Sequence, residues 1–103
     1  MKVNGVELEL NLLKASIAER YEAAFRTMQE DVENIPKGVT LAESIRQQCT
    51  IVKHLVEKLF GEGVYEKIVK DPEDLKEHLD LAKTIVKTAQ AQKNYAIKGI
   101  AKA

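Results

Sequence analysis

The chain has 103 residues, and its 16 basic residues balance its 16 acidic ones, so its formal net charge is zero. This length fits a single domain, and the charge balance excludes a general attraction of the whole chain to nucleic acid or to an anionic membrane. Cys49 is the single cysteine, which excludes an intrachain disulfide and fits a reducing compartment. Because the sequence has no signal-peptide pattern and no apolar run near the ~20 residues of a membrane span, we expect a cytoplasmic protein.

Residues 1–13, MKVNGVELELNLL, predict a β-hairpin. Asn4 and Gly5 tolerate the positive φ angles of a type I′ turn, and the residues after them alternate between apolar and polar, as in a half-buried strand. A lone two-stranded ribbon is only marginally stable in water, so we expect it to lie on the helices or to pair with strands of another copy or a partner. The residues expected to make these contacts are Val3, Val6, Leu8 and Leu10.

Two helices are predicted next, at residues 16–33 and 40–60. Ser16 and Thr40 each precede a glutamate by three residues, which is the capping-box pattern of a helix start. The first helix is expected to end at the break that contains proline and glycine, and the second at Gly61, because glycine readily adopts the positive φ that closes a helix. Both helices carry apolar residues at spacings of three and four, which predicts one buried face on each.

The remaining elements are a short segment and a long helix. Residues 62–69 predict a short helix or a structured loop, and residues 71–98 predict the last helix, with Asp71 as its N-cap and Pro72 at its first position. Together the elements predict a mostly α fold of three to four helices with an N-terminal β-hairpin. We therefore expect a small α+β protein with a single domain at residues 1–103.

Apolar residues in the last predicted helix recur at about 3.5 residues per turn, as in a coiled-coil seam. The seam comprises Leu75, Leu79, Ala82, Val86, Ala89, Lys93, Ala96 and Ile100. It either packs against the other helices of the chain, which we favour, or pairs with a neighbouring chain. The contacts with an oligomer or partner would then come from Leu75, Leu79, Ala82, Val86 and Ala89.

Charge is unevenly distributed along the chain. Residues 61–80 contain three lysines against seven acidic residues, whereas residues 81–103 contain five lysines and no acidic residue. The favoured interpretation is that these lysines solvate the helix and complement its negative end. The alternative is contact with an acidic partner or with the acidic block of another copy, through Lys83, Lys87, Lys93 and Lys98. Nucleic acid is a weaker hypothesis, because the segment lacks arginine and has no aromatic residue other than Tyr95.

No residue pattern predicts catalysis, and none predicts a metal or a cofactor. His54 and His78 are isolated in sequence, and a zinc site would need three or four converging ligands. His78 is expected on a solvated helix face, and Cys49 is interpreted as a small buried side chain on an apolar stripe. The glycines at 61 and 63 lack the strand and lysine of a phosphate-binding loop. We therefore expect a protein that is not an enzyme.

Three stretches carry a resemblance to a known class of proteins. The opening MKVNGVELELNLL followed by a helix, the central LFGEGVYEKIV and its Asp-Pro continuation resemble small proteins encoded in the tail-assembly regions of siphophages and prophages of Gram-positive bacteria. Tail assembly chaperones often start with a similar hairpin and continue as a helical body. The resemblance implies a protein made in the bacterial host cytoplasm that oligomerises and binds the tape measure protein or tail tube subunits.

The leading hypothesis is therefore a tail assembly chaperone or a related morphogenesis factor that acts by binding. One alternative is a structural component of the virion, such as a head–tail connector or a minor tail protein. Another is a small regulator that binds nucleic acid through residues 83–102. Presence in purified virions would favour the structural component, and salt-sensitive binding of DNA or RNA would favour the regulator.

Overall fold

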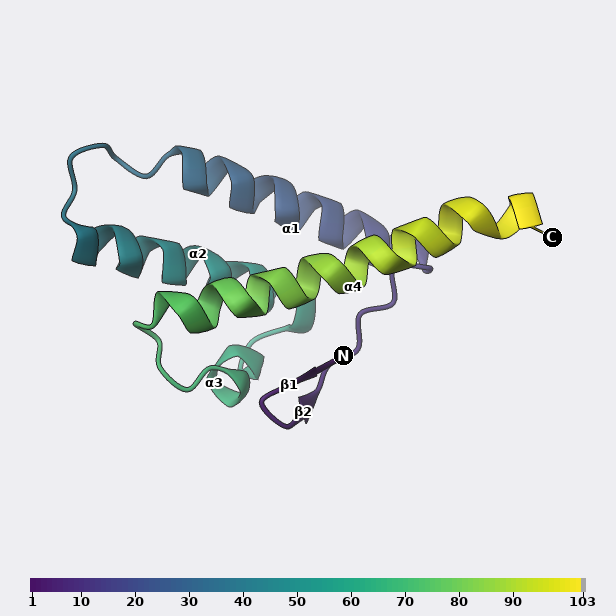
Figure 1. Ribbon diagram of the computed structural model, residues 1–103, viewed down its shortest axis with the longest axis horizontal. Coiled ribbons are helices and arrows are strands. Elements are labelled where there is room, and N and C mark those ends of the chain that lie inside the picture. Colours follow the sequence, from purple (N-terminus) through teal and green to yellow (C-terminus); the bar gives the residue numbers. More distant parts are fainter. Residues whose placement is uncertain (103) are drawn as a thin grey trace.

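The computed structural model describes the backbone of residues 1–102 and the side chains of residues 1–99. Its elements in chain order are β1 (Lys2–Val3), β2 (Val6–Glu7), α1 (Ala15–Glu33), α2 (Leu41–Phe60), α3 (Val64–Ile68) and α4 (Leu75–Lys102). The helices α1 and α2 run antiparallel, α4 lies across them, and α3 and the β-hairpin lie on one side of α4 (Figure 1). The predicted fold, mostly α with an N-terminal hairpin in one small domain, is confirmed.

The central helix of the core is α2, which packs against α1, α3 and α4. Leu55 and Val56 are almost completely buried in it, and burying such side chains stabilises the fold by about 1.5–3 kcal/mol each. The predicted ends of this helix are confirmed, since the Thr40 hydroxyl accepts a hydrogen bond from the Glu43 N–H at 3.2 Å and Gly61 has a φ of 94°. Cys49 is buried as predicted, and burial raises the pKa of its thiol.

The predicted start of α1 differs from the observed one by one residue, and α4 starts four residues later and ends four residues later than predicted. Helix α1 begins at Ala15 without a side-chain cap, because the turn at Asn11, whose carbonyl accepts from the Lys14 N–H at 3.3 Å, already directs the chain into the helix. Ser16 therefore lies inside the first turn. Helix α4 begins at Leu75 instead of residue 71, because Asp74 accepts a hydrogen bond in the first turn, from the Lys76 N–H at 3.0 Å.

The β-hairpin has the predicted turn but a shorter second strand. Asn4 and Gly5 have φ angles of 47° and 81°, and the register pairs Val3 with Val6. After the Leu8 N–H donates to the Met1 carbonyl at 2.7 Å, the chain leaves the strand. The predicted strand through residue 12 is wrong because the backbone groups of residues 10–12 bond to a side chain of α4 instead, as described below.

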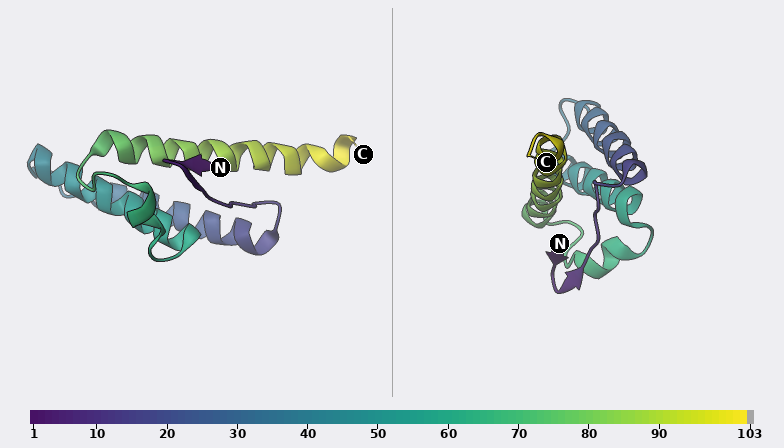
Figure 2. Two further views of the ribbon diagram at one scale, coloured as in Figure 1. Left: turned by 90° about the horizontal axis from the view of Figure 1, so that it is seen from below. Right: turned by 90° about the vertical axis from the view of Figure 1, so that its right-hand side faces the viewer.

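Residues 1–12, which we call the N-terminal segment, lie along α4 and α3 rather than projecting into solvent (Figure 2). Leu8 and Leu10 are each only 6% exposed in the core of their own chain, and Val3 and Val6 are half-buried against the same core. The expectation that these four residues contact another chain is therefore corrected for Leu8 and Leu10. Burial of their side chains under α4 already satisfies the apolar face of the segment.

Of the predicted seam of α4, only Ala89 is fully buried among the described residues. The fully buried residues are His78, Leu81, Ile85 and Ala89. Successive residues of an α-helix are about 100° apart around its axis, so most seam residues lie about 60° around α4 from the centre of the buried face. Leu75, Ala82 and Val86 are half-buried, Leu79 is 42% exposed, and Lys93 and Ala96 are exposed, while the side chain of Ile100 lies outside the described part. The apolar arc of α4 is wider than one stripe, and packing on α2 selects the part that contains Leu81 and Ile85.

Candidate functional site

A groove with a volume of about 610 Å³ separates the first half of α1 from the second half of α4. Its apolar lining is contributed by Leu12, Ala18, Tyr21, Phe25, Val86, Ala89, Ala96 and Ile97. Glu22, Arg26 and Lys93 also border it. The two helices that form its walls, α1 and α4, run in opposite directions (Figure 1). We call this feature the α1–α4 groove.

The α1 wall is built around two aromatic rings. Tyr21 and Phe25 are four residues apart on the helix, and their ring centroids lie 5.8 Å apart with 22° between the ring planes. Residues at this spacing share one face of a helix, so the rings stack along the groove. Burial raises the pKa of Tyr21 above its ordinary value of 10, at which its hydroxyl is already protonated at neutral pH. Apart from Glu22 and Arg26 at its border, this wall is therefore uncharged, with two aromatic rings at its centre.

The α4 wall is formed by the flank that contains most of the predicted seam. Ala89 and Ala96 are small and leave room in the groove. Ile97, next to Ala96 on the groove, is 67% exposed, and α4 extends past the start of α1 (Figure 1). Leu79, at the other end of this flank, is 18 residues from Ile97, which corresponds to about 27 Å of helix. The flank therefore has partly exposed apolar side chains at both ends, with Gln90 and Lys93 between them.

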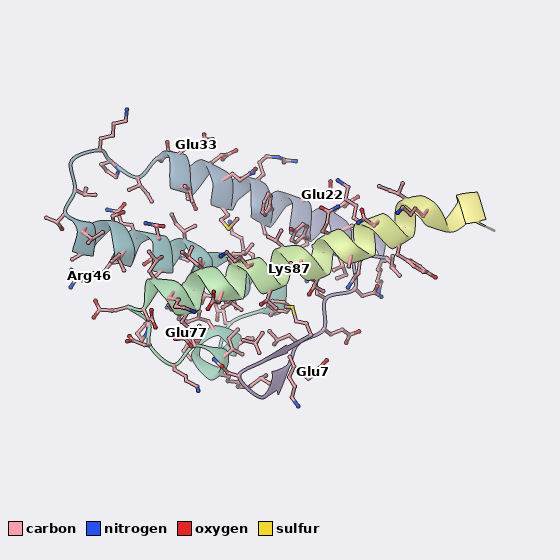
Figure 3. All side chains as sticks on the ribbon, viewed as in Figure 1. Glu7, Glu22, Glu33, Arg46, Glu77 and Lys87 are labelled. Carbon is pink, nitrogen blue, oxygen red and sulfur yellow. The ribbon has the colours of Figure 1, made fainter. Side chains whose placement is uncertain are left out.

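Lysines follow the solvent side of this α4 flank. Lys83, Lys87, Lys93 and Lys98 are exposed, and none forms an ion pair with another residue within residues 1–99. On α1 both Glu22 and Arg26 border the groove, and on α4 Lys93 borders it. Figure 3 shows Glu22 on α1 and, outside the groove lining, Lys87 on α4. The charged residues that border the groove are therefore one acid and one base on α1 and one lysine on α4, although the chain as a whole is neutral. The structure leaves these lysines available to an acidic partner without assigning one.

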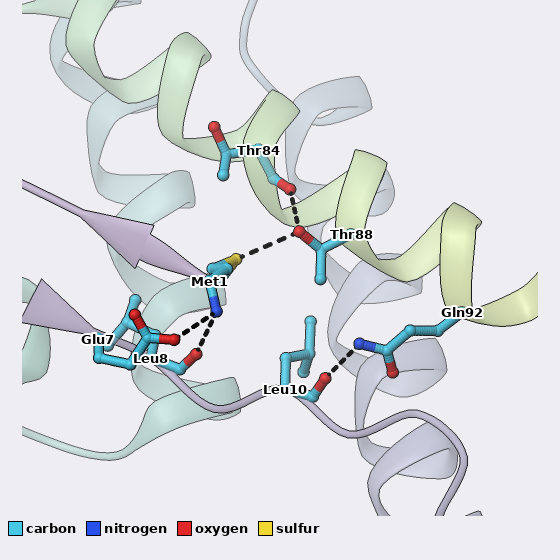
Figure 4. Close-up of polar contacts among 7 residues, drawn as sticks. All are labelled: Met1, Glu7, Leu8, Leu10, Thr84, Thr88 and Gln92. Atoms are coloured by element: carbon cyan, nitrogen blue, oxygen red, sulfur yellow. Dashed lines mark hydrogen bonds and ion pairs between the residues drawn. The ribbon is translucent and has the colours of Figure 1, made fainter.

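Leu12 of the N-terminal segment borders one end of the groove, and the amide side chain of Gln92 holds this part of the segment to α4. Nε2 of Gln92 donates to the Leu10 carbonyl at 2.6 Å, and Oε1 of Gln92 accepts from the Leu12 N–H at 2.6 Å. The first of these bonds is visible in Figure 4. The amide thus pairs with the backbone as a neighbouring strand would. Sequence reasoning missed Gln92, whose only signal is an amide beside an apolar stripe.

The start of the segment is also tied to α4 and to itself. The Met1 ammonium donates to the Leu8 carbonyl at 2.8 Å and pairs with Glu7 at 3.2 Å (Figure 4). The Thr88 hydroxyl lies 3.5 Å from the sulfur of Met1. These contacts join the two ends of the hairpin and hold Met1 against α4.

Comparison with known proteins places the chain in a family. Residues 4–102 match the model of a family described as "Family of unknown function (DUF6673)". The chain belongs to the DUF6673 family. No curated protein and no solved structure matches it. The matched range includes both walls of the groove and Gln92, so these features of the DUF6673 chain lie within the region that defines its family.

A carboxylate anchors the tip of the hairpin in this DUF6673 protein. Glu77 accepts hydrogen bonds from the backbone N–H groups of Lys70 and Asp71 at 2.9 and 3.0 Å and from the Asn4 side chain at 3.2 Å. Burial by itself would raise the pKa of Glu77, but these hydrogen bonds outweigh it and lower the pKa below its ordinary value. Glu77 therefore links the hairpin turn, the α3–α4 connection and α4.

His78 is completely buried, so its predicted place on a solvated helix face is wrong. Its Nδ1 lies 2.6 Å from the Asp74 carbonyl, and its Nε2 lies 2.6 Å from the Tyr65 hydroxyl. Because a carbonyl can only accept, Nδ1 carries the proton and Nε2 accepts from Tyr65. Burial raises the pKa of Tyr65 to about 12. These bonds satisfy His78 and join α3 to α4, so we assign it a structural role.

The described residues bring together no group of three or more His, Cys, Asp and Glu side chains that could hold a metal ion. His54 lies on the exposed side of α2, in a shallow depression bordered by Asp31, Glu43 and Arg46. The α1–α4 groove is therefore the candidate site with the strongest support, and its chemistry is that of apolar recognition bordered by charge.

Proposed function

We propose that this DUF6673 protein acts by binding an α-helical segment of a phage tail protein, as a tail assembly chaperone does. The observation that carries this proposal is the open apolar α1–α4 groove. An amphipathic helix binds such a groove through apolar side chains at positions i, i+3, i+4 and i+7. The part of α4 that lines the groove, residues 86–97, extends for about 17 Å, which matches three turns of a bound helix.

The choice of a tail protein as partner rests on the resemblance of MKVNGVELELNLL and LFGEGVYEKIV to tail-region proteins of phages and prophages. The proposed partner is the tape measure protein or the tail tube subunit. Within residues 1–102 no helix combines the length and apolar character needed to cross a membrane. Action in the host cytoplasm during tail assembly is part of the proposal.

The test is co-purification with tape measure and tail tube proteins encoded beside this chain. Ile97→Glu places a charge on the groove at an exposed position and should leave the fold intact while lowering partner affinity at least tenfold. The matched control is Leu41→Glu, because Leu41 is 77% exposed at the start of α2 and does not line the groove. Equal binding by both variants would contradict the proposed site.

A second measurement separates a chaperone from a structural component. A chaperone leaves the complex when the tail is complete, so the protein should be absent from purified virions. Its presence there in a fixed number of copies would overturn the chaperone role and favour the structural alternative. Failure of both tail proteins to bind the wild-type chain would overturn the proposed function altogether.

A further inference from the structure

We infer that the partner helix bound in the α1–α4 groove carries acidic residues along one flank, and that these residues lie against α4 and fix the direction in which the helix binds. That the occupant is a helix rests on the proposed function. Its charge pattern and its orientation follow from the unequal charge of the two groove walls.

The part of α1 that lines the groove has no net charge. The charged residues of the lining are Glu22 and Arg26 on α1 and Lys93 on α4. Glu22 and Arg26 are four residues apart and share one face of their helix, so an occupant that passes both meets opposite charges that largely offset each other. The α4 wall contributes a positive charge alone. Charge therefore selects the occupant on its α4 side rather than on its α1 side.

Further lysines extend the positive charge of α4 toward solvent. Successive residues of an α-helix are about 100° apart, so Lys83 and Lys87 lie about 20° and 60° further around α4 than Gln90, on its solvent side. Gln90 lines the groove, and these two lysines and Lys98 are exposed. We call Lys83, Lys87, Lys93 and Lys98 the α4 lysines. They extend over about 22 Å of helix, which exceeds the stretch of α4 that lines the groove.

The α4 lysines have no acidic partner among the described side chains. From residue 81 onward the chain contains no acidic residue. Asp80, which directly precedes this stretch, is paired with Lys76 at 2.8 Å. Within residues 1–99 none of the α4 lysines forms an ion pair. An acidic flank of a bound helix therefore supplies counter-charges that the chain itself does not provide, whereas a basic flank meets repulsion.

The difference between the walls also determines the direction of the bound helix. A helix whose apolar face lies in the groove has one flank beside α1 and the other beside α4. Turning the helix end for end exchanges these two flanks. A helix that is acidic on one flank therefore meets the α4 lysines in one direction only, and in the other direction its acids meet Glu22 and Arg26. Charge complementarity of this kind contributes more to specificity than to affinity.

The test uses three synthetic helical peptides that share one apolar face. One flank carries glutamates in the first peptide, lysines in the second and glutamines in the third, and the opposite flank carries glutamines in all three. At low salt the wild-type chain should bind the acidic peptide about fivefold more tightly than the neutral one, and the basic peptide more weakly than the neutral one. In about 1 M salt the three affinities should converge, because the exposed charges are then screened.

Charge reversal on α4 shows which wall is responsible. The double variant Lys87→Glu/Lys93→Glu should bind the basic peptide more tightly than the acidic one. The control Lys37→Glu/Lys67→Glu changes the net charge equally at exposed positions outside the groove and should keep the wild-type order. Circular dichroism identifies a variant that fails to fold. The salt dependence of the wild-type chain then decides the question without any variant.

The direction of binding is measured with a spin label at the N-terminus of the acidic peptide. The label broadens amide signals of the protein at one end of the groove, either near Val86 or near Ile97, which both line it. Moving the glutamates to the opposite flank of the peptide should transfer the broadening to the other end. Broadening at the same end with both peptides would overturn the inferred control of direction.

Other results would contradict the acidic flank. They are equal binding of the three peptides, no binding of any of them, and an unchanged order of affinity in the Lys87→Glu/Lys93→Glu variant. Loss of peptide binding as the protein concentration rises would assign the groove to a second copy, and displacement of the peptide by a DNA oligonucleotide would assign the α4 lysines to nucleic acid. Either result would also overturn the inference.

The tail proteins separate this inference from the proposed function. Preference for the acidic peptide without binding of the tape measure or tail tube protein would overturn the proposed function and leave the acidic flank standing. Binding of a tail protein with equal affinity by the wild-type chain and the Lys87→Glu/Lys93→Glu variant would overturn the acidic flank and leave the proposed function standing.

Discussion

The N-terminal segment and the exposed end of α4 are both rich in apolar residues, yet they have opposite surroundings. Leu8 and Leu10 are buried, whereas Tyr95 and Ile97 are about two-thirds exposed. The segment has little regular structure, so its backbone groups need partners, and Gln92 and Glu77 hold it on α4. The end of α4 satisfies its own backbone hydrogen bonds as a helix and can extend without a neighbour. In this protein the apolar side chains are therefore buried in the segment whose backbone N–H and C=O groups also need hydrogen-bond partners outside it.

The largest expected difference between these regions is in the cost of removing an apolar side chain. Leu10→Ala should lower the free energy of unfolding by about 2–5 kcal/mol, because it leaves a cavity in the core. Ile97→Ala should change it by less than about 0.5 kcal/mol, because the side chain is mostly exposed. Urea unfolding of both variants at the same protein concentration measures the contrast. Similar losses in the two variants would show that the end of α4 is packed in solution.

A second prediction concerns the amide that holds the segment. Gln92→Ala should lower the free energy of unfolding by about 1–3 kcal/mol, because the Leu10 carbonyl and the Leu12 N–H lose their partner. Hydrogen exchange at the Leu12 amide should accelerate at the same time. Gln90→Ala is the control, since Gln90 bonds only to Asn94 among the described residues. Unchanged exchange at Leu12 would contradict the role assigned to Gln92.

A third and smaller loss of stability is expected at the carboxylate that holds the hairpin tip. The pKa of Glu77 is lowered in the folded state from an ordinary value of 4.5, so its contribution to stability is complete above about pH 4.5 and is lost as the pH falls through the folded-state pKa. Glu77→Gln should be less stable than wild type by about 1 kcal/mol at pH 7 and equally stable near pH 2. Unfolding midpoints at both pH values test this, with Glu62→Gln as an exposed control. A difference that persists unchanged at pH 2 would exclude the carboxylate as its cause.

Prediction from the sequence was accurate where a few neighbouring residues decide the conformation. Asn4 and Gly5 form the predicted turn, and Thr40 and Gly61 bound the predicted helix, because these residues act on backbone within about four positions of themselves. Even local patterns were ambiguous where two caps compete. Asp71 and Asp74 both accept backbone hydrogen bonds at 3.0 Å, and only the second lies at the start of α4.

The candidate site was predicted in part. The seam identified most of the α4 flank that lines the groove, and the lysines beside it were named, but the α1 wall and Gln92 were not. Tyr21 and Phe25 were recognised only as apolar side chains, since the sequence does not show which helix lies opposite them. Their place in the groove depends on the crossing of α1 and α4.

The sequence by itself determined the helices, the hairpin turn and the separation of charge along the chain. Only the tertiary structure decided that Leu8 and Leu10 face inward, that His78 is buried, and that the seam of α4 becomes one wall of a groove. The physical reason is the distance along the chain between the groups involved. Gln92 bonds to backbone groups 80 and 82 residues away, and Asn4 bonds to a carboxylate 73 residues away. Such contacts leave no periodic pattern in the sequence, and they exist only once the helices have packed.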